Sequence, residues 1–102
     1  MRQFDVVENP SSQARRYAPY LVVLQSHYLE GVESVILAPL VRDSLRPILP
    51  LDIPVTFADE SLVIAMAELA SVPRAVTIRR AGTVGEHEEA IRRAIDRLFT
   101  GF

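Results

Sequence analysis

The sequence predicts a mainly β fold of the α+β class, in which several short strands close on one another and one helix ends the chain. Three observations support this prediction. Short apolar runs rich in β-branched and aromatic residues recur along the chain and are bounded by turn-forming residues. Prolines interrupt the middle of the chain between Pro39 and Pro54. Clear helical periodicity is confined to the region near the C-terminus.

The composition is typical of one globular domain. The chain has 102 residues, of which 49% are hydrophobic and 24% charged, and a chain of this length buries about two-thirds of its unfolded surface. We therefore expect a single domain over residues 1–102. No apolar run reaches the roughly 18 residues of a membrane span, and the first residues lack the apolar core of a signal peptide. We expect a cytoplasmic protein without a membrane partner.

The charged residues exclude several classes of function. The net charge is −2, whereas proteins that coat duplex DNA carry an excess of basic residues. All eleven basic residues are arginine, which excludes enzymes that use a lysine base or Schiff base. We interpret the doublets at 15–16 and 79–80 as exposed charge. The absence of cysteine excludes disulfides and thiolate metal sites.

The first three predicted strands lie in the N-terminal half. Gln3–Val7 alternates weakly and is followed by the turn cluster at 9–12. Pro19–Gln25 is nearly continuous in apolar residues, which indicates burial on both faces. Ser34–Leu40 is a second run of this kind, and we expect the two runs to pair as a hairpin.

The middle of the chain is harder to assign. The prolines from Pro39 to Pro54 exclude a long helix and a central strand from that stretch. Ser61–Ala70 combines helix-forming and strand-forming residues almost evenly, and on propensity alone we assign it to a helix. Ala75–Arg79 is predicted to form another strand.

The last predicted element is a helix over approximately residues 86–99. Two acid–arginine pairs lie four residues apart on its polar face, Glu88 with Arg92 and Glu89 with Arg93. Acidic residues occupy its first turn, as the helix dipole prefers, and Gly101 follows as a stop signal. Its apolar face is formed by Ile91, Ala94, Ile95, Leu98 and Phe99.

Residues with catalytic or metal-binding chemistry are few. His27 and His87 are the only imidazoles, and neither has a second ligand at metal-binding spacing. No nucleophile elbow or phosphate-binding glycine loop is present. We interpret the adjacent carboxylates Asp59 and Glu60 as a solvated corner rather than an acid–base pair. The sequence favours a binding protein over an enzyme, with no catalytic residues, metal or cofactor.

A set of short motifs runs through the whole chain in order. The motifs are Gln3-Phe4, Pro19-Tyr20, Gln25-Ser26, Pro39-Leu40, Asp59-Glu60-Ser61 and Ala70-Ser71-Val72-Pro73. With these motifs, and with a gap-free match in length from Ser71 to the end, the chain resembles the CcdB family. These proteins are toxins of toxin–antitoxin systems that poison bacterial DNA gyrase.

The resemblance implies a small twisted antiparallel barrel-like sheet with one C-terminal helix, and a strand instead of a helix at Ser61–Ala70. It implies a type II toxin that is not an enzyme, and that binds the gyrase A subunit and traps the cleaved-DNA complex. It implies a symmetric homodimer with the C-terminal helices near the two-fold axis. It also implies a cognate antitoxin whose disordered C-terminal segment folds on the toxin. The two proteins would repress their own operon, with the antitoxin contacting the DNA.

The resemblance further implies a gyrase-binding site at the C-terminus. In the family the terminal tripeptide, typically Trp-Gly-aliphatic, engages gyrase, and Thr100 here departs from the usual Trp. The gyrase-binding residues implied in this chain are Tyr28, Leu29, Asp96, Phe99, Thr100, Gly101 and Phe102. The alternative for Gly101 is a simple helix cap, with Phe102 packed back on the last turn. We favour presentation of this end to a partner.

Two other functions stay open from the sequence. Ribonuclease toxins that cleave mRNA share a related barrel fold, and a fold does not determine a function. A non-toxic homologue that still binds an antitoxin is the second alternative.

Overall fold

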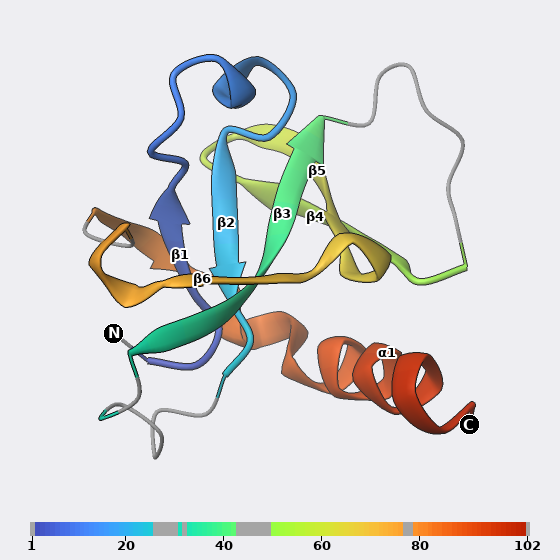
Figure 1. The fold of residues 1–102 in the computed structure, drawn as a ribbon. Helices are drawn as coiled ribbons and strands as arrows, with labels where there is room; N and C mark the ends of the chain where they lie inside the picture. Colours follow the sequence, from blue (N-terminus) through green and yellow to red (C-terminus); the bar gives the residue numbers. More distant parts are fainter. Residues whose placement is uncertain (1, 26–30, 32, 43–49, 77–78, 102) are drawn as a thin grey trace.

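The computed structural model describes residues 2–25, 31, 33–42, 50–76 and 79–101 (Figure 1). In these residues one antiparallel sheet curls into a half-barrel, and a single α-helix packs against it, so the predicted fold class is confirmed. The strands are β1 (Asp5–Glu8), β2 (Tyr20–Val23), β3 (Ser34–Arg42), β4 (Asp52–Phe57), β5 (Glu60–Ala65), β6 (Ala70–Pro73) and β7 (Arg80–Thr83). The helix is α1 (Glu88–Thr100), and short 3₁₀ turns are η1 (Ala14–Arg16), η3 (Met66–Glu68), η4 (Arg74–Val76) and η5 (Gly85–His87).

The predicted hairpin is present at the centre of the sheet. The strand order is β4-β5-β3-β2-β1-β7, and β6 pairs with β3 beside this path. β2 and β3 are antiparallel, with Val22 opposite Ala38. Val22 is fully buried in the main core and Val23 is buried in a second cluster, because successive side chains of a strand point to opposite faces. Burial on both faces of this strand is therefore confirmed.

The exclusion of a central strand from the stretch between Pro39 and Pro54 is wrong at Pro39, whereas the strand predicted at Ser34–Leu40, which contains Pro39, is confirmed. Pro39 lies within β3, opposite Leu21 of β2. Leu24 N donates to Ile36 O, and the alternation of an antiparallel ladder makes Leu21–Pro39 a pair without mutual hydrogen bonds. On the other edge of β3 the register with β6 ends at Leu37, and the register with β5 begins at Leu40. Proline is tolerated here because the neighbouring strand of β3 changes from β6 to β5 at this position. No hydrogen bond between strands therefore requires the N–H that proline lacks.

The helix assigned to Ser61–Ala70 on propensity is wrong, and the strand implied by the resemblance is confirmed for its first half. β5 ends at Ala65, η3 makes one turn, and β6 begins at Ala70. The apolar residues Leu62 to Met66 are all buried, some in the main core and some in a third cluster. Tertiary burial of both faces therefore overrides the helical propensity of this stretch.

The strand predicted at Ala75–Arg79 is also wrong. Residues 74–76 form η4, residues 77 and 78 lie outside the described part of the chain, and the strand β7 begins at Arg80. Arg80 Nε lies 3.3 Å from the carboxylate of Asp5 in β1, which is 5% exposed. This long-range ion pair accompanies the pairing of β7 with β1, and no local pattern reveals it.

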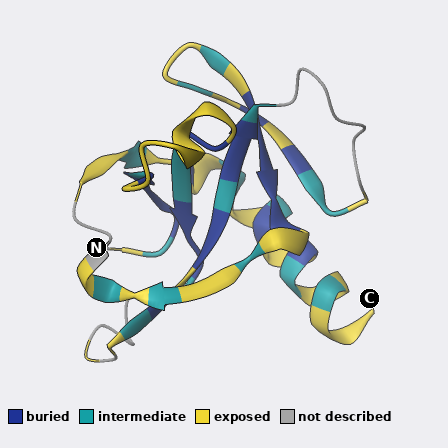
Figure 2. Cartoon of the chain, turned by 45° about the horizontal axis from the view of Figure 1, so that its top comes forward, coloured by how far each residue is buried: buried dark blue, intermediate teal, exposed yellow. Residues whose placement is uncertain are grey.

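The main core lies inside the curled sheet and is covered by α1. Figure 2 shows buried segments along β3 and β5 and on the first half of α1, whereas the end of α1 is exposed. Leu40, Ile64, Met66 and Ile91 are among its largest fully buried side chains. Among the described residues, no helix has both the length and the apolar character needed to cross a bilayer.

The two outermost strands, β4 and β7, approach each other at one point. A Cβ atom built on Gly82 of β7 would lie 2.9 Å from ring atoms of Phe57 in β4. The Phe57 ring also packs edge-on against Tyr20, with 4.9 Å between ring centroids. Gly82 therefore provides the space in which an aromatic ring links the two edges of the sheet.

Replacement of Gly82 by alanine is expected to lower the free energy of unfolding by about 1–2 kcal/mol, since the Phe57 ring must move away from the new methyl group. Urea denaturation measures this difference. Gly31→Ala is the matched control because no atom lies within 4 Å of its added Cβ. The close approach of β4 and β7 would be disproved if the two alanine variants were equally stable.

Candidate binding site at the end of helix α1

The sequence of α1 stabilises the helix locally on its solvent side. Arg92 Nε lies 3.1 Å from the Glu88 carboxylate, and Arg93 lies 3.5 Å from Glu89, both at a spacing of four residues. These pairs are exposed, and each contributes a few tenths of a kcal/mol. Glu88 and Glu89 also stand in the first turn, where the helix dipole favours negative charge.

The first half of α1 is held firmly against the half-barrel. Ile91 is fully buried and Ala94 is 6% exposed, both in the main core. On the adjoining side of the helix, the guanidinium carbon of Arg92 lies 5.5 Å from the ring centroid of Phe4, a cation–π distance. Phe4 itself is buried and has a φ of 70°. These contacts make α1 a rigid support for the residues at its end.

The helix ends at Thr100, and Gly101 follows it as a cap, as the stop signal predicted. Gly101 adopts the left-handed conformation with a φ of 80°, and its N–H donates to Arg97 O at 3.1 Å. A residue with a Cβ is strained in this conformation. The Thr100 hydroxyl donates to Asp96 O one turn earlier. Gly101 therefore caps the helix whatever else this end of the chain does.

Four of the predicted site residues come together on the last turn of α1. Asp96, Thr100 and Gly101 are exposed, and Phe99 is 69% exposed although it is a large apolar side chain. The helix face predicted to be apolar is therefore buried at Ile91 and open at Phe99. The other three predicted residues, Tyr28, Leu29 and Phe102, lie outside the described residues.

An apolar groove runs beside the end of α1. Its cavity volume is about 170 Å³. Its lining comes from β3, from α1, and from residues just after β2 and η3, namely Leu24, Gln25, Ile36, Leu69, Ile95 and Phe99. Ile36 is 38% exposed although it lies within an apolar strand. The exposed side chain of Phe99 forms part of this apolar groove.

Sequence reasoning did not assign Ile36, Leu69 or Ile95 to this surface. Ile36 lies in an unbroken apolar run, and Leu69 lies in a segment whose secondary structure was misassigned. Ile95 was placed correctly on the apolar face of the helix. The sequence did contain one sign of this surface. The apolar face of the helix continues to Phe99, which is further than the half-barrel covers it.

The described residues show little that is suited to acid–base or metal chemistry. Within them, no three histidine, cysteine, aspartate or glutamate side chains gather closely enough to hold a metal ion. Asp59 lies in the exposed turn between β4 and β5, and Glu60 pairs with Arg42 at 2.6 Å. His87 lies 3.8 Å from the exposed Glu86, and His27 lies outside the described residues.

Comparisons with known structures identify the fold. The toxin MazF-mt6 of Mycobacterium tuberculosis is similar over 96% of this chain and 96% of its own, with a TM-score of 0.72 and 17% sequence identity. A second toxin, described as an Mtb toxin, is similar over 78% of this chain and 91% of its own, with a TM-score of 0.67 and 19% identity. Identities this low establish a shared fold alone.

Comparisons of sequence identify the family. A search of curated proteins found no match to this chain. The family model described as CcdB protein matches residues 3–101, which include all seven described strands and all of α1. The chain therefore belongs to the CcdB family, whose members are toxins of toxin–antitoxin systems.

Proposed function

We propose that this toxin binds the A subunit of DNA gyrase with the end of α1 and traps gyrase in its DNA-cleaved state. The observation that carries the proposal is the 69% exposure of Phe99 on a rigid, capped helix, beside Asp96 and Thr100. An aromatic side chain buries a large apolar area and loses little conformational freedom on binding. Tyr28, Leu29, Gly101 and Phe102 complete the proposed gyrase-binding site. The toxin acts by binding and is not itself an enzyme.

The proposal includes a symmetric homodimer formed through the apolar groove. Ile36, Leu69 and Ile95 contribute an apolar surface there, and such surfaces mark protein contacts, whereas the more exposed Phe99 is left for gyrase. In an isologous dimer the same patch meets itself across a two-fold axis. The two copies of α1 then lie near that axis.

The antitoxin is the second partner. Membership of the family implies an antitoxin, and we propose that its disordered C-terminal segment folds on the toxin and neutralises it. The complex represses its own operon in the cytoplasm, and the antitoxin makes the DNA contacts. The net charge of −2 supports this division of roles, since direct DNA binding depends on many basic residues that neutralise phosphates.

Purified toxin, gyrase and plasmid DNA test the proposal directly. We expect linear DNA to accumulate when the toxin is added to gyrase and the reaction is stopped with detergent and protease, since a trapped cleaved complex releases broken DNA. Without gyrase the plasmid stays intact. A parallel incubation with mRNA in metal-free buffer tests the ribonuclease alternative.

The outcomes separate the three candidate functions. Cleavage of the RNA with no effect on gyrase contradicts the proposal and favours a ribonuclease toxin. Inactivity in both assays, together with retained binding of an antitoxin, favours a non-toxic homologue. Linear DNA that appears only with gyrase supports the proposed poison.

A further inference from the structure

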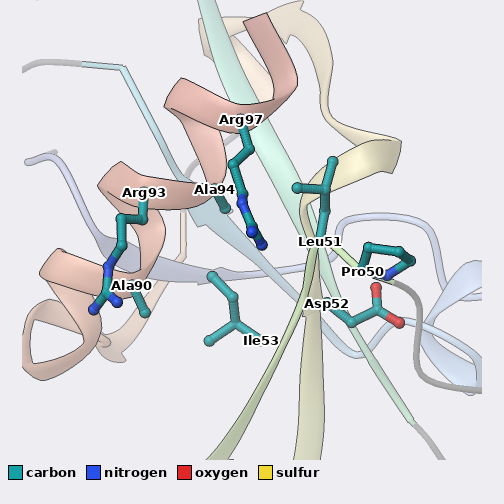
Figure 3. Close-up of a pocket in the computed structure, with 8 residues that line it drawn as sticks. All are labelled: Pro50, Leu51, Asp52, Ile53, Ala90, Arg93, Ala94 and Arg97. Atoms are coloured by element: carbon teal, nitrogen blue, oxygen red, sulfur yellow. The ribbon is translucent and has the colours of Figure 1, made fainter. Parts of the chain in front are cut away.

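α1 is flanked by a second groove, on the side away from the apolar groove. This arginine groove lies between α1 and the start of β4, and its cavity volume is about 480 Å³. Its floor and walls are formed chiefly by Leu51, Ile53, Ala90, Arg93, Ala94 and Arg97 (Figure 3). It shares no lining residue with the apolar groove that contains Phe99.

Two arginine side chains line the arginine groove beside its apolar floor. Figure 3 shows the Arg97 side chain extending from the helix toward Leu51 and Ile53, while the Arg93 side chain ends beside Ala90 at the other end of the groove. Ile53 is 9% exposed and Ala94 is 6% exposed, so the floor is continuous with the main core. An arginine beside apolar surface binds carboxylates strongly, because the bidentate pair is partly shielded from water.

The acidic groups near the groove leave its positive charge available. Arg93 pairs with Glu89 at 3.5 Å, but the two side chains are 71% and 90% exposed, so that pair is weak and easily exchanged. Asp52 lines the β4 end of the groove, and Figure 3 shows its carboxylate beside Pro50, away from the guanidinium groups of Arg93 and Arg97. The groove is therefore complementary to an anionic ligand that also carries apolar surface.

We propose that the arginine groove binds an acidic, amphipathic peptide segment of a partner protein. Two carboxylates of the segment pair with Arg93 and Arg97, and an apolar side chain packs on Leu51 and Ile53. The arginines lie four residues apart on α1, about 6 Å along its axis. Acidic residues four apart in a helix, or two apart in a strand, have this spacing.

The chemistry of the groove favours a peptide over other occupants. A nucleic-acid backbone has no apolar side chain to cover Leu51 and Ile53, and the chain has a net charge of −2. A second copy that met this groove across a two-fold axis would bring like-charged arginines together. The antitoxin is the natural source of such a segment, and only this identification of the source rests on the proposed function.

A synthetic peptide with the full-length toxin tests the inference. The probe is a fluorescein-labelled helical peptide with two glutamates four residues apart and a leucine three residues after the first glutamate. We expect it to bind in low salt, to weaken with added salt, and to shift the backbone amide resonances of Leu51, Ile53 and Ala90. Arg93→Gln and Arg97→Gln should each weaken binding about tenfold, as loss of a charge-assisted pair predicts.

Matched controls separate charge, apolar contact and location. Arg16→Gln removes an exposed arginine of η1, at the opposite end of the molecule from α1 (Figure 1), and should leave peptide binding unchanged. A peptide with Gln for both Glu should bind at least tenfold more weakly. A peptide with Ser for Leu should also bind more weakly. Circular dichroism of each toxin variant verifies that the fold is retained.

Each other outcome overturns the inference. Absence of peptide binding overturns it, as does binding that is insensitive to both arginine substitutions. Equal competition by inorganic phosphate indicates a simple anion site, and stronger competition by a single-stranded oligonucleotide indicates a nucleic-acid surface. Groove resonances that shift with toxin concentration alone indicate a second copy. None of these results depends on gyrase activity, so failure here is distinguishable from failure of the proposed function.

Discussion

Deletion of Thr100–Phe102 is expected to abolish growth inhibition while leaving a folded protein. The deletion removes the left-handed cap at Gly101 and the hydrogen bond from Thr100 to Asp96 O, which together contribute about 1–2 kcal/mol. It also removes the tip that we place against gyrase. Loss of Phe102, the terminal aromatic residue of the proposed site, should weaken gyrase binding by about a hundredfold or more even though Phe99 remains. Plating of cells that express each variant, together with gyrase binding by the purified proteins, measures both effects.

The control for this deletion must lose similar stability without changing the tip. Gly82→Ala is suitable because it is expected to cost about 1–2 kcal/mol at the contact with Phe57, and we expect it to remain toxic. Thr100→Trp should tighten gyrase binding by about tenfold, since the indole restores buried area and stacking. Full toxicity of the truncated chain would exclude Thr100–Phe102 from the gyrase-binding site.

Replacement of Ile91 by alanine is expected to lower the free energy of unfolding by about 3–4 kcal/mol. Ile91 is fully buried where α1 meets the main core, so the truncation leaves a cavity beneath the helix. This is a large part of the 5–15 kcal/mol typical of small proteins. Urea denaturation at one fixed protein concentration measures the loss, because the proposed dimerisation would make apparent stability depend on concentration.

Ile95→Ala is the matched variant one turn further along α1. Ile95 is half-buried and lines the apolar groove, so we expect a loss of only about 1 kcal/mol in stability. Its main effect should be a weaker homodimer, measured by sedimentation velocity at micromolar concentration. Equal losses of stability for both variants would contradict the docking of α1 through Ile91. A monomeric wild-type protein at this concentration would exclude the proposed dimer.

The elements that the sequence predicted correctly are those with local physical causes. The i, i+4 pairs of Glu88 with Arg92 and Glu89 with Arg93, and the stop at Gly101, act within a few residues of the chain. The apolar runs that became β2 and β3 were recognisable because burial on both faces demands apolar residues at every position. The order of the motifs also placed the chain correctly in its family.

The misassigned elements depend on contacts between distant segments. Pro39 fits inside β3 because β5 replaces β6 as the partner strand at that point. Residues 61–70 divide among a strand, a 3₁₀ turn and a second strand because β5 and β6 pair with different parts of β3. The secondary-structure propensity of a short segment does not indicate which distant strand will pair with it, or along which edge.

For the candidate site, the sequence determined the amphipathic helix and its terminal Phe-Thr-Gly-Phe, but not which apolar residues reach solvent. Ile36, Ala38 and Leu40 point to the same face of β3, yet only Ile36 is exposed. The same holds along α1, where Ile91 is buried and Phe99 is 69% exposed. The curled sheet covers only the first half of the helix, so the packing of distant strands decides which part of a uniform apolar face is available to a partner.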